Sequence, residues 1–235
     1  MNHIPFNNYS RANELLYILN ATKREDLDSI SKIGIQKVLY LANLLAPVKN
    51  VILSTLRFLS YTRGPYAPDV QNTLDQLTAN GFVYITTFRE FKAKSSVATY
   101  SISTAGEAVV NKLTVNPKED EKKWWFESIL KLSAIYSDQP AFLEGGSYSG
   151  FDKIVNLVYE DDTFLNVKDN LQFASVINLK REDAPTFTLI NFIKNYVSEN
   201  KLLDNGKNER WNAEIVLIGF FEFLYSKYLD NLSNE

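Results

Sequence analysis

Hydrophobic residues in the first 113 positions follow two different spacings along the chain. In most segments they recur every three or four positions, the spacing that places side chains on one face of an α-helix. Ser10 is the expected N-cap of the first segment, Ser29 or Ser31 starts the second, and Pro47 ends it. The spacing predicts helices over residues 11–20, 29–45, 51–60, 68–80 and 104–113.

Between the last two of these segments the spacing changes to that of β-strands. Residues 82–88 are rich in β-branched and aromatic side chains, and residues 97–103 alternate apolar and polar positions. The polar stretch between them carries Arg89, Lys92 and Lys94 and would form the loop of a hairpin. Helices followed by a hairpin and a further helix are typical of a winged helix-turn-helix domain, in which the hairpin is the wing.

The second half of the chain shows helical spacing only. A polar stretch at residues 114–123 contains a helix-starting proline and marks a domain boundary. We expect a winged helix-turn-helix domain with an N-terminal helix at residues 1–116 and an α-helical interaction domain at residues 117–235. The expected fold class is therefore α+β and mostly α. In the second domain a glycine-rich loop is expected at 144–150, and helices at 119–136, 151–159, 165–178, 187–203 and 211–232.

Two pairs of adjacent aromatic residues lie in the second half. They are Trp124 with Trp125 and Phe220 with Phe221. Neighbours on a helix point about 100° apart, so both members of a pair cannot face the same side. One member of each pair is expected either at a subunit interface or between several helices of its own domain. We expect Trp124 on the buried side of its helix and take Trp125 and Phe221 as candidate partner-binding residues.

The composition argues against most kinds of catalytic and metal site. The chain has no cysteine, and His3 is its one histidine. Disulfides, thiolate metal sites and catalysis by Ser-His-Asp or Cys-His groups are therefore not expected. The chain also lacks the Gly-x-x-x-x-Gly-Lys-Ser/Thr phosphate loop. We expect no catalytic residue, no metal and no cofactor, although an enzyme that uses only carboxylates and lysines stays open.

The N-terminus and the apolar runs point to a cytoplasmic protein. Residues 1–8 do not combine a charged start with an apolar run, so no secretory signal is expected. The run at 215–221 is among the longest apolar stretches, and it is too short to span a bilayer. A membrane partner is not expected.

The charges bear on what the first half would bind. Residues 1–113 carry a net charge of +4, whereas residues 114–235 carry −7. The helix expected at 68–80, which would enter the DNA groove, contains Asp69 and Asp75 and no lysine or arginine. Because the two carboxylates would repel phosphates, a protein partner is favoured over base-specific DNA reading. Non-specific contact with double-stranded DNA stays open, through Arg57, Arg89, Lys92 and Lys94.

The turn at residues 61–69, Tyr-Thr-Arg-Gly-Pro-Tyr-Ala-Pro-Asp, is the most specific motif of the chain. Its two prolines fix backbone dihedrals ahead of the following helix. Tyr61, Arg63 and Tyr66 are candidate partner-binding residues, with the alternative that Tyr66 only packs the turn.

Three further segments accompany this turn: Ile-Gln-Lys-Val-Leu-Tyr-Leu-Ala at 35–42, Leu-Asp-Gln-Leu-Thr-Ala-Asn-Gly-Phe-Val at 74–83 and Tyr-Ser-Ile-Ser-Thr-Ala-Gly at 100–106. Together they resemble the YwgA-like winged-helix family and, more distantly, Panacea-type antitoxin domains. Ala67 and Asp69 stand where the turn of that family carries serine and glutamate. The resemblance covers the first half of the chain.

A winged helix followed by an all-helical half is similar in layout to the small middle subunits of ABC-three-component and Lamassu-type anti-phage systems. This resemblance implies a non-catalytic adaptor subunit that docks an SMC-like ATPase or an effector protein in antiviral defence. The alternative is a DNA-binding transcriptional regulator or antitoxin that acts as a homodimer. Homo-oligomerisation stays open under either hypothesis.

Overall fold

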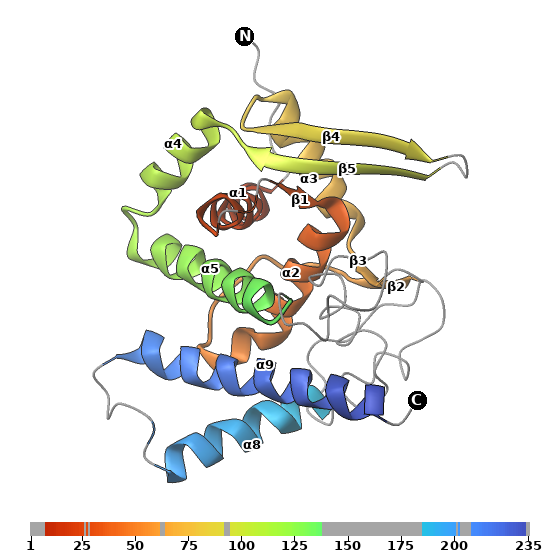
Figure 1. The fold of residues 1–235 in the computed structure, drawn as a ribbon. Helices are drawn as coiled ribbons and strands as arrows, with labels where there is room; N and C mark the ends of the chain where they lie inside the picture. The colour runs from red at the N-terminus through yellow and green to blue at the C-terminus, as the bar shows by residue number, and fades with distance from the viewer. Residues whose placement is uncertain are drawn as a thin grey trace. The chain divides into compact units, whose positions relative to one another are not determined.

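The computed structural model describes residues 8–25, 27, 29–61, 64–91, 95–137, 185–200, 202 and 208–233. These residues form seven α-helices, one 3-10 helix, a three-stranded antiparallel sheet and a two-stranded sheet, so the fold is α+β and mostly helical (Figure 1). The chain divides into two compact units, which we describe separately. The first comprises Met1–Ala42, Ile52–Phe58 and Tyr66–Leu130, and the second comprises Asn43–Val51, Leu59–Pro65 and Lys131–Glu235.

Helix α1 lies at the centre of the first unit. It spans Tyr9–Arg24, and its buried residues include Leu15, Leu16, Ile18 and Leu19. It contacts strand β5 and helices α3 and α4 (Figure 1). The other helices that contribute to this unit are α2 (Lys32–Leu45), α3 (Pro68–Ala79), α4 (Thr104–Leu113) and the first part of α5 (Pro117–Ser137).

The start of α1 differs from the expectation. Asn8, not Ser10, is the N-cap: its side-chain oxygen accepts a hydrogen bond from the Arg11 N–H at 3.0 Å. The Ser10 hydroxyl lies 3.5 Å from the Glu14 carboxylate instead. The helix begins two residues earlier than expected because an equally good capping residue stands upstream.

The three-stranded sheet has the order β1-β5-β4 and is antiparallel throughout. Its strands are β1 (Ile30–Ser31), β4 (Val83–Phe91) and β5 (Ser95–Ile102). Val83 pairs with Ile102, and Ile30 pairs with Tyr100; all four side chains are buried. The strands expected at 82–88 and 97–103 are thus confirmed, and the hairpin extends away from α1 and α4 (Figure 1).

The base of the hairpin is tied to α4. Ser103 caps α4 through the Gly106 N–H, and its hydroxyl also donates to the Gly81 carbonyl at 2.7 Å. A Cβ on Gly106 would collide with the Phe82 carbonyl and lie 2.7 Å from Cγ1 of Ile102. Glycine is therefore required at position 106 for α4 to pack this closely on the hairpin.

The chain between α2 and α3 contradicts the expected helix at 51–60. It contains a 3-10 helix η1 (Ala46–Val48) and a two-stranded sheet of β2 (Leu59–Tyr61) and β3 (Gly64–Tyr66), and residues 51–58 have no regular structure. Ser54 donates its backbone N–H to Oε1 of Glu14 at 2.6 Å and its hydroxyl to Oε2. These hydrogen bonds attach Ser54 to α1, and Ile52 is 83% exposed.

The second unit contains the end of α5 together with α8 (Pro185–Glu199) and α9 (Glu209–Ser233). Helices α8 and α9 contact each other. Tyr136 of α5 stacks on Phe221 with ring centres 5.7 Å apart and donates its hydroxyl to Glu222 at 2.7 Å. The helices expected near 119–136, 187–203 and 211–232 are confirmed, while the loop at 144–150 and the helices at 151–159 and 165–178 lie outside the described residues.

The boundary expected at residue 116 falls within the first unit, which continues to Leu130. The first half of α5 is tied into that unit: the Tyr17 hydroxyl donates to Glu119 at 2.7 Å, and the Trp125 indole N–H donates to the Ala42 carbonyl at 3.1 Å. In the part of the chain that the structure describes, none of the helices combines the length and the hydropathy needed to cross a bilayer.

Candidate partner-binding surface

Helix α3 is held in place by a side chain of α2. The Gln36 amide accepts a hydrogen bond from the Ala67 N–H at 2.9 Å and donates one to the Ala67 carbonyl at 3.1 Å. Ala67 is extended and precedes Pro68, the first residue of α3. Two of the four motifs that define the family resemblance, at 35–42 and at 61–69, therefore contact each other directly.

A second tether joins α3 to α1. The Arg11 guanidinium lies 3.2 Å from the Asp69 carboxylate and 3.5 Å from the Thr55 carbonyl. Asp69 stands in the first turn of α3, where a negative charge is also favoured by the helix dipole. One of the two carboxylates expected to repel DNA is thus partly neutralised within the unit.

The outer face of α3 is acidic and polar. Asn72 and Asp75 are exposed, and Asp75 accepts a hydrogen bond from Gln71 at 2.6 Å. The helix contains no lysine or arginine. An incoming phosphate backbone would meet carboxylates and amides here rather than cations.

Several basic residues of the first unit are already paired with carboxylates. Lys23 pairs with Glu107, and Lys122 lies 2.9 Å from Glu119. Arg24 and Lys123 share one partner, Glu127, at 2.8 and 2.6 Å. Of these cations only Lys23 and Arg24 are exposed and belong to residues 1–113, and surface pairs of this kind add little to stability.

The residues of the 61–69 turn are only partly described. Tyr66 is half-buried, and the Lys32 ammonium sits 5.6 Å from the centre of its ring, within the range of a cation–π contact. Tyr61 lies in β2, but the placement of its side chain is not described, and Arg63 lies outside the described residues. The contact with Lys32 accounts for Tyr66 as a residue that packs the turn, and its role toward a partner stays a prediction.

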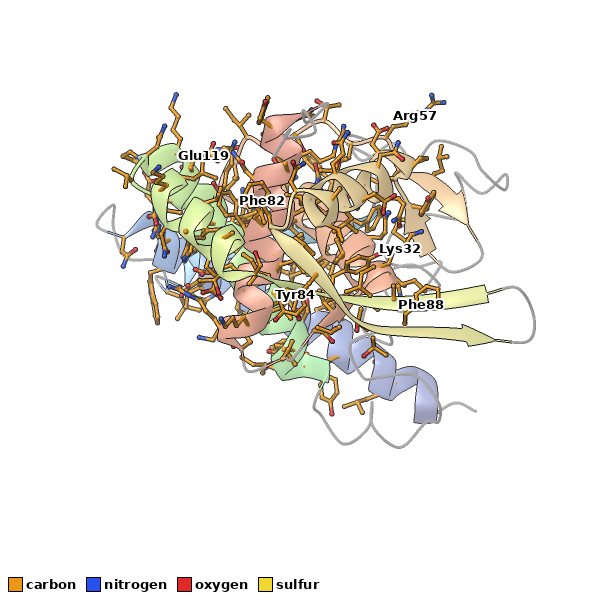
Figure 2. The ribbon with its side chains drawn as sticks, turned by 90° about the horizontal axis from the view of Figure 1, so that it is seen from above. Lys32, Arg57, Phe82, Tyr84, Phe88 and Glu119 are labelled. Carbon is orange, nitrogen blue, oxygen red and sulfur yellow. The ribbon has the colours of Figure 1, made fainter. Side chains whose placement is uncertain are left out.

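Of the four candidate DNA contacts, Arg57 is the one whose side chain the structure describes, so their role stays a prediction. Arg57 is exposed on the 52–58 segment and lies apart from the hairpin residue Phe88 in the view of Figure 2. Arg89 pairs with Val97 in the sheet, and the placement of its side chain is not described. Lys92 and Lys94 lie outside the described residues.

Trp125 and Phe221, the two aromatic candidates of the second half, are both buried in the chain. Trp125 bonds Ala42, whereas Trp124, which was expected on the buried side, is half-buried. Phe221 stacks on Tyr136 and meets Phe220 edge-on, with ring centres 6.0 Å apart. Both members of the Phe220–Phe221 pair are buried, which matches the alternative of a helix enclosed on several sides.

Sequence reasoning missed an apolar surface on β4. Tyr84, Ile85 and Phe88 are 50%, 46% and 59% exposed, and Figure 2 shows Tyr84 nearer the base of the hairpin and Phe88 nearer its tip. A signal was present: residues 82–88 contain apolar side chains at adjacent positions, more than the single buried face of a surface hairpin needs.

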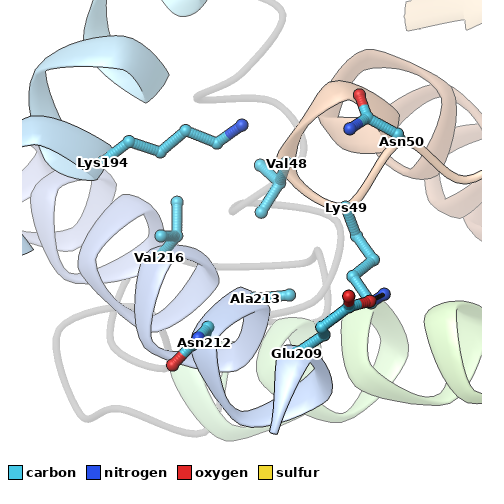
Figure 3. A pocket seen from close by; sticks show the side chains of 8 residues that line it. All are labelled: Val48, Lys49, Asn50, Lys194, Glu209, Asn212, Ala213 and Val216. Carbon is cyan, nitrogen blue, oxygen red and sulfur yellow. Dashed lines mark hydrogen bonds and ion pairs between the residues drawn. The ribbon is translucent and has the colours of Figure 1, made fainter. Parts of the chain in front are cut away.

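The second unit contains a pocket of about 350 Å³ between η1 and the helices α8 and α9 (Figure 3). Val48, Ala213 and Val216 form its apolar part. Lys194 donates to the Pro47 carbonyl at 2.9 Å, and burial lowers the pKa of its ammonium group. Lys49 pairs with Glu209 at 2.5 Å. Both lysines at this pocket are engaged with groups of the protein itself.

Among the described residues, histidines and carboxylates do not gather in groups of three or more that could hold a metal ion. Comparison with known proteins adds no relative: no protein-family model matches the chain, and no curated protein matches it.

Proposed function

We propose that this chain is a non-catalytic adaptor subunit whose first unit is a winged-helix module that docks a protein partner. The order α1-β1-α2-η1-β2-β3-α3-β4-β5-α4, with β1 paired to β5, supports the winged-helix assignment once the η1-β2-β3 connection is treated as an insertion. In such an arrangement α3 takes the place of the recognition helix and the β4–β5 hairpin that of the wing.

The connection between α2 and α3 departs from the common helix-turn-helix. That motif joins its helices by a turn of about three or four residues, whereas here residues 46–67 separate them. The Gln36–Ala67 and Arg11–Asp69 contacts replace the short turn in fixing α3.

The observation that carries the proposal is the acidic outer face of α3. A recognition helix that enters the major groove meets phosphates on both sides and needs donors or cations toward them. Asn72 and Asp75 instead present an amide and a carboxylate. This face suits a basic protein surface, and the family resemblance suggests an SMC-like ATPase or an effector as its owner.

A matched pair of substitutions tests the docking face. Asn72→Lys adds a positive charge to the outer face of α3, and Asn111→Lys makes the same change at an exposed position of α4. After co-expression with the products of adjacent genes, size-exclusion chromatography should show a complex with the native chain and with Asn111→Lys. Asn72→Lys should weaken that complex by roughly tenfold or more, as expected for like charges at an interface.

Two results would overturn this assignment. One is a chain that remains alone with every adjacent gene product. The other is a complex that Asn72→Lys and Asn111→Lys weaken equally. Either result places the contact, if there is one, away from α3.

The second candidate is a homodimeric DNA-binding regulator, favoured by the exposed Arg57 and by the three basic residues in and beside the hairpin. It predicts salt-sensitive binding to duplex DNA in a gel-shift titration. Replacing Arg57, Arg89, Lys92 and Lys94 by alanine should then abolish DNA binding. Under the adaptor proposal the same replacement leaves complex assembly unchanged.

A further inference from the structure

Strand β4 forms one edge of the three-stranded sheet. In the order β1-β5-β4 it has β5 on one side, and no strand of the described residues pairs with its other side. An edge of this kind presents a row of backbone donors and acceptors to any further extended chain. The hairpin reaches away from α1 and α4, which leaves this edge accessible along its outer part (Figure 1).

Residues 83–88 of β4 lack the charges and prolines that often protect edge strands. Natural edge strands carry lysines, prolines or inward-pointing charges that discourage pairing. Residues 83–88 read Val-Tyr-Ile-Thr-Thr-Phe, and the charged residues Arg89 and Glu90 follow within the same strand. About half of the surface of Tyr84, Ile85 and Phe88 is open to solvent.

A β-bulge at Thr86 changes which residues of β4 lie on the same face of the sheet. Ile85 faces Tyr100 and Phe88 faces Ala98, so the two residues lie on the same face of the sheet although they are three positions apart. In a regular strand such residues point to opposite faces. The register shift between Ile85 and Thr87 makes the difference, and the Thr86 hydroxyl, 2.7 Å from that of Thr99, anchors it.

We propose that a second copy of this chain pairs with this edge, β4 against β4, about a two-fold axis between Thr86 and Thr87. In that register Ile85 of each copy lies opposite Phe88 of the other. Only residues on the same face can meet in this way, and the bulge supplies that condition. The result is an isologous interface, in which a β-branched side chain meets an aromatic ring twice.

A second copy fits this edge better than an unrelated strand because the edge is complementary to itself. The same register sets position 84 opposite position 89, and both lie on the other face, since their β5 partners Ser101 and Val97 are four positions apart. The two small sheets would become one six-stranded sheet across the axis. The contact uses a single strand from each copy, so it should be a weak dimer that dissociates on dilution.

Sedimentation velocity of the full chain over a wide concentration range tests the dimer. The native chain should show a reversible monomer–dimer equilibrium. Ile85→Lys should be monomeric throughout, because it places two like charges in the pairing region. Ile52→Lys makes the same change at an exposed position outside the sheet and should dimerise as the native chain does. Circular dichroism establishes that both variants fold.

The register itself is tested by cross-linking, which the absence of cysteine in the chain makes clean. Tyr84→Cys and Arg89→Cys are prepared as separate proteins. Under mild oxidation their mixture should form a disulfide-linked dimer, because opposite positions lie about 5 Å apart between Cα atoms. Neither protein alone should do so, since position 84 of one copy is then about five residues from position 84 of the other.

A native chain that stays monomeric, an Ile85→Lys protein that still dimerises, or cross-links that form equally in the mixture and in the separate proteins would each overturn the proposal. The inference does not rest on the adaptor function: Asn72→Lys, on α3, should leave the dimer intact.

Discussion

The carboxylate of Glu14 is fully buried at the centre of the first unit. It accepts the backbone N–H and the hydroxyl of Ser54, and it thereby fixes the 52–58 segment to α1. Desolvation by burial is the main effect on this group and raises its pKa above the ordinary 4.5, although the two bonds from Ser54 oppose the shift. The folded chain therefore binds this proton more tightly than the unfolded chain does.

The raised pKa makes part of the stability depend on pH. The contribution of protonated Glu14 is complete below pH 4.5 and is lost as the pH rises through the folded-state pKa. Glu14→Gln keeps the size of the side chain and removes the titration. The free energy of unfolding of the native chain minus that of Glu14→Gln should therefore decrease in urea titrations as the pH rises above 4.5. A difference that is constant or rises with pH would contradict this account of Glu14.

At the scale of elements, the contact between Gln36 and Ala67 replaces the short turn that α2 and α3 lack. Gln36 is buried and meets both backbone groups of one residue. The amide is suited to this position because it contains a donor and an acceptor in one plane.

Gln36→Glu retains the shape and removes the donor. The Ala67 carbonyl then loses its partner and faces a carboxylate, so we expect the free energy of unfolding to fall by about 1–3 kcal/mol. Hydrogen exchange at the start of α3 should accelerate more than exchange in α4. Gln76→Glu, a half-buried position on α3 itself, is the matched control and should change stability by about 0.5 kcal/mol or less. Equal effects of the two substitutions would mean that the contact does not hold α3.

Elements with local signals could be predicted from the sequence. Helix α3 begins at Pro68 and ends just before Gly81, which adopts a positive φ of 75°. Proline at a helix start and glycine after a helix end are both recognisable in the sequence. The segment at 51–58 could not be predicted in the same way. In the helix expected at 51–60, Ile52, Leu56 and Leu59 have helical spacing. Ser54, however, is bound to a carboxylate 40 positions away, and no local pattern indicates that partner.

The candidate surface shows the same limit. The charges on α3 could be predicted from the sequence, because the spacing of its apolar residues shows which side of the helix faces the solvent. Which of Trp124 and Trp125 is buried could not be predicted, since this depends on the hydrogen bond from the indole of Trp125 to the Ala42 carbonyl. The apolar edge of β4 depends on strand order and on a bulge, both of which are set by tertiary pairing.

At the scale of the molecule, each compact unit contains its own buried side chains. In the second unit Phe220, Phe221 and Leu217 of α9 are fully or almost fully buried, as are Ile190 and Val197 of α8. Substitution in one core is therefore expected to loosen the elements of that unit first.

Phe220→Ala tests this expectation. Loss of a buried phenylalanine should lower the stability of the second unit by about 3–5 kcal/mol. Hydrogen exchange measured by mass spectrometry should rise in α8 and α9, while α1 and α3 keep their native rates. Phe223→Ala, at a partly exposed position of the same helix, should have a much smaller effect. A uniform rise across the whole chain would show that the two units unfold as one.

Helix α5 limits how such a protein can be divided. In its first turns Glu119 accepts a hydrogen bond from Tyr17, and in its last turn Tyr136 stacks on Phe221. Proteolytic cleavage or recombination in the polar stretch before α5 would separate the amino-terminal fragment from Trp125, whose indole donates a hydrogen bond to the Ala42 carbonyl. Helix α5 thus belongs to both units. Neither unit could be transferred to another gene without part of the other.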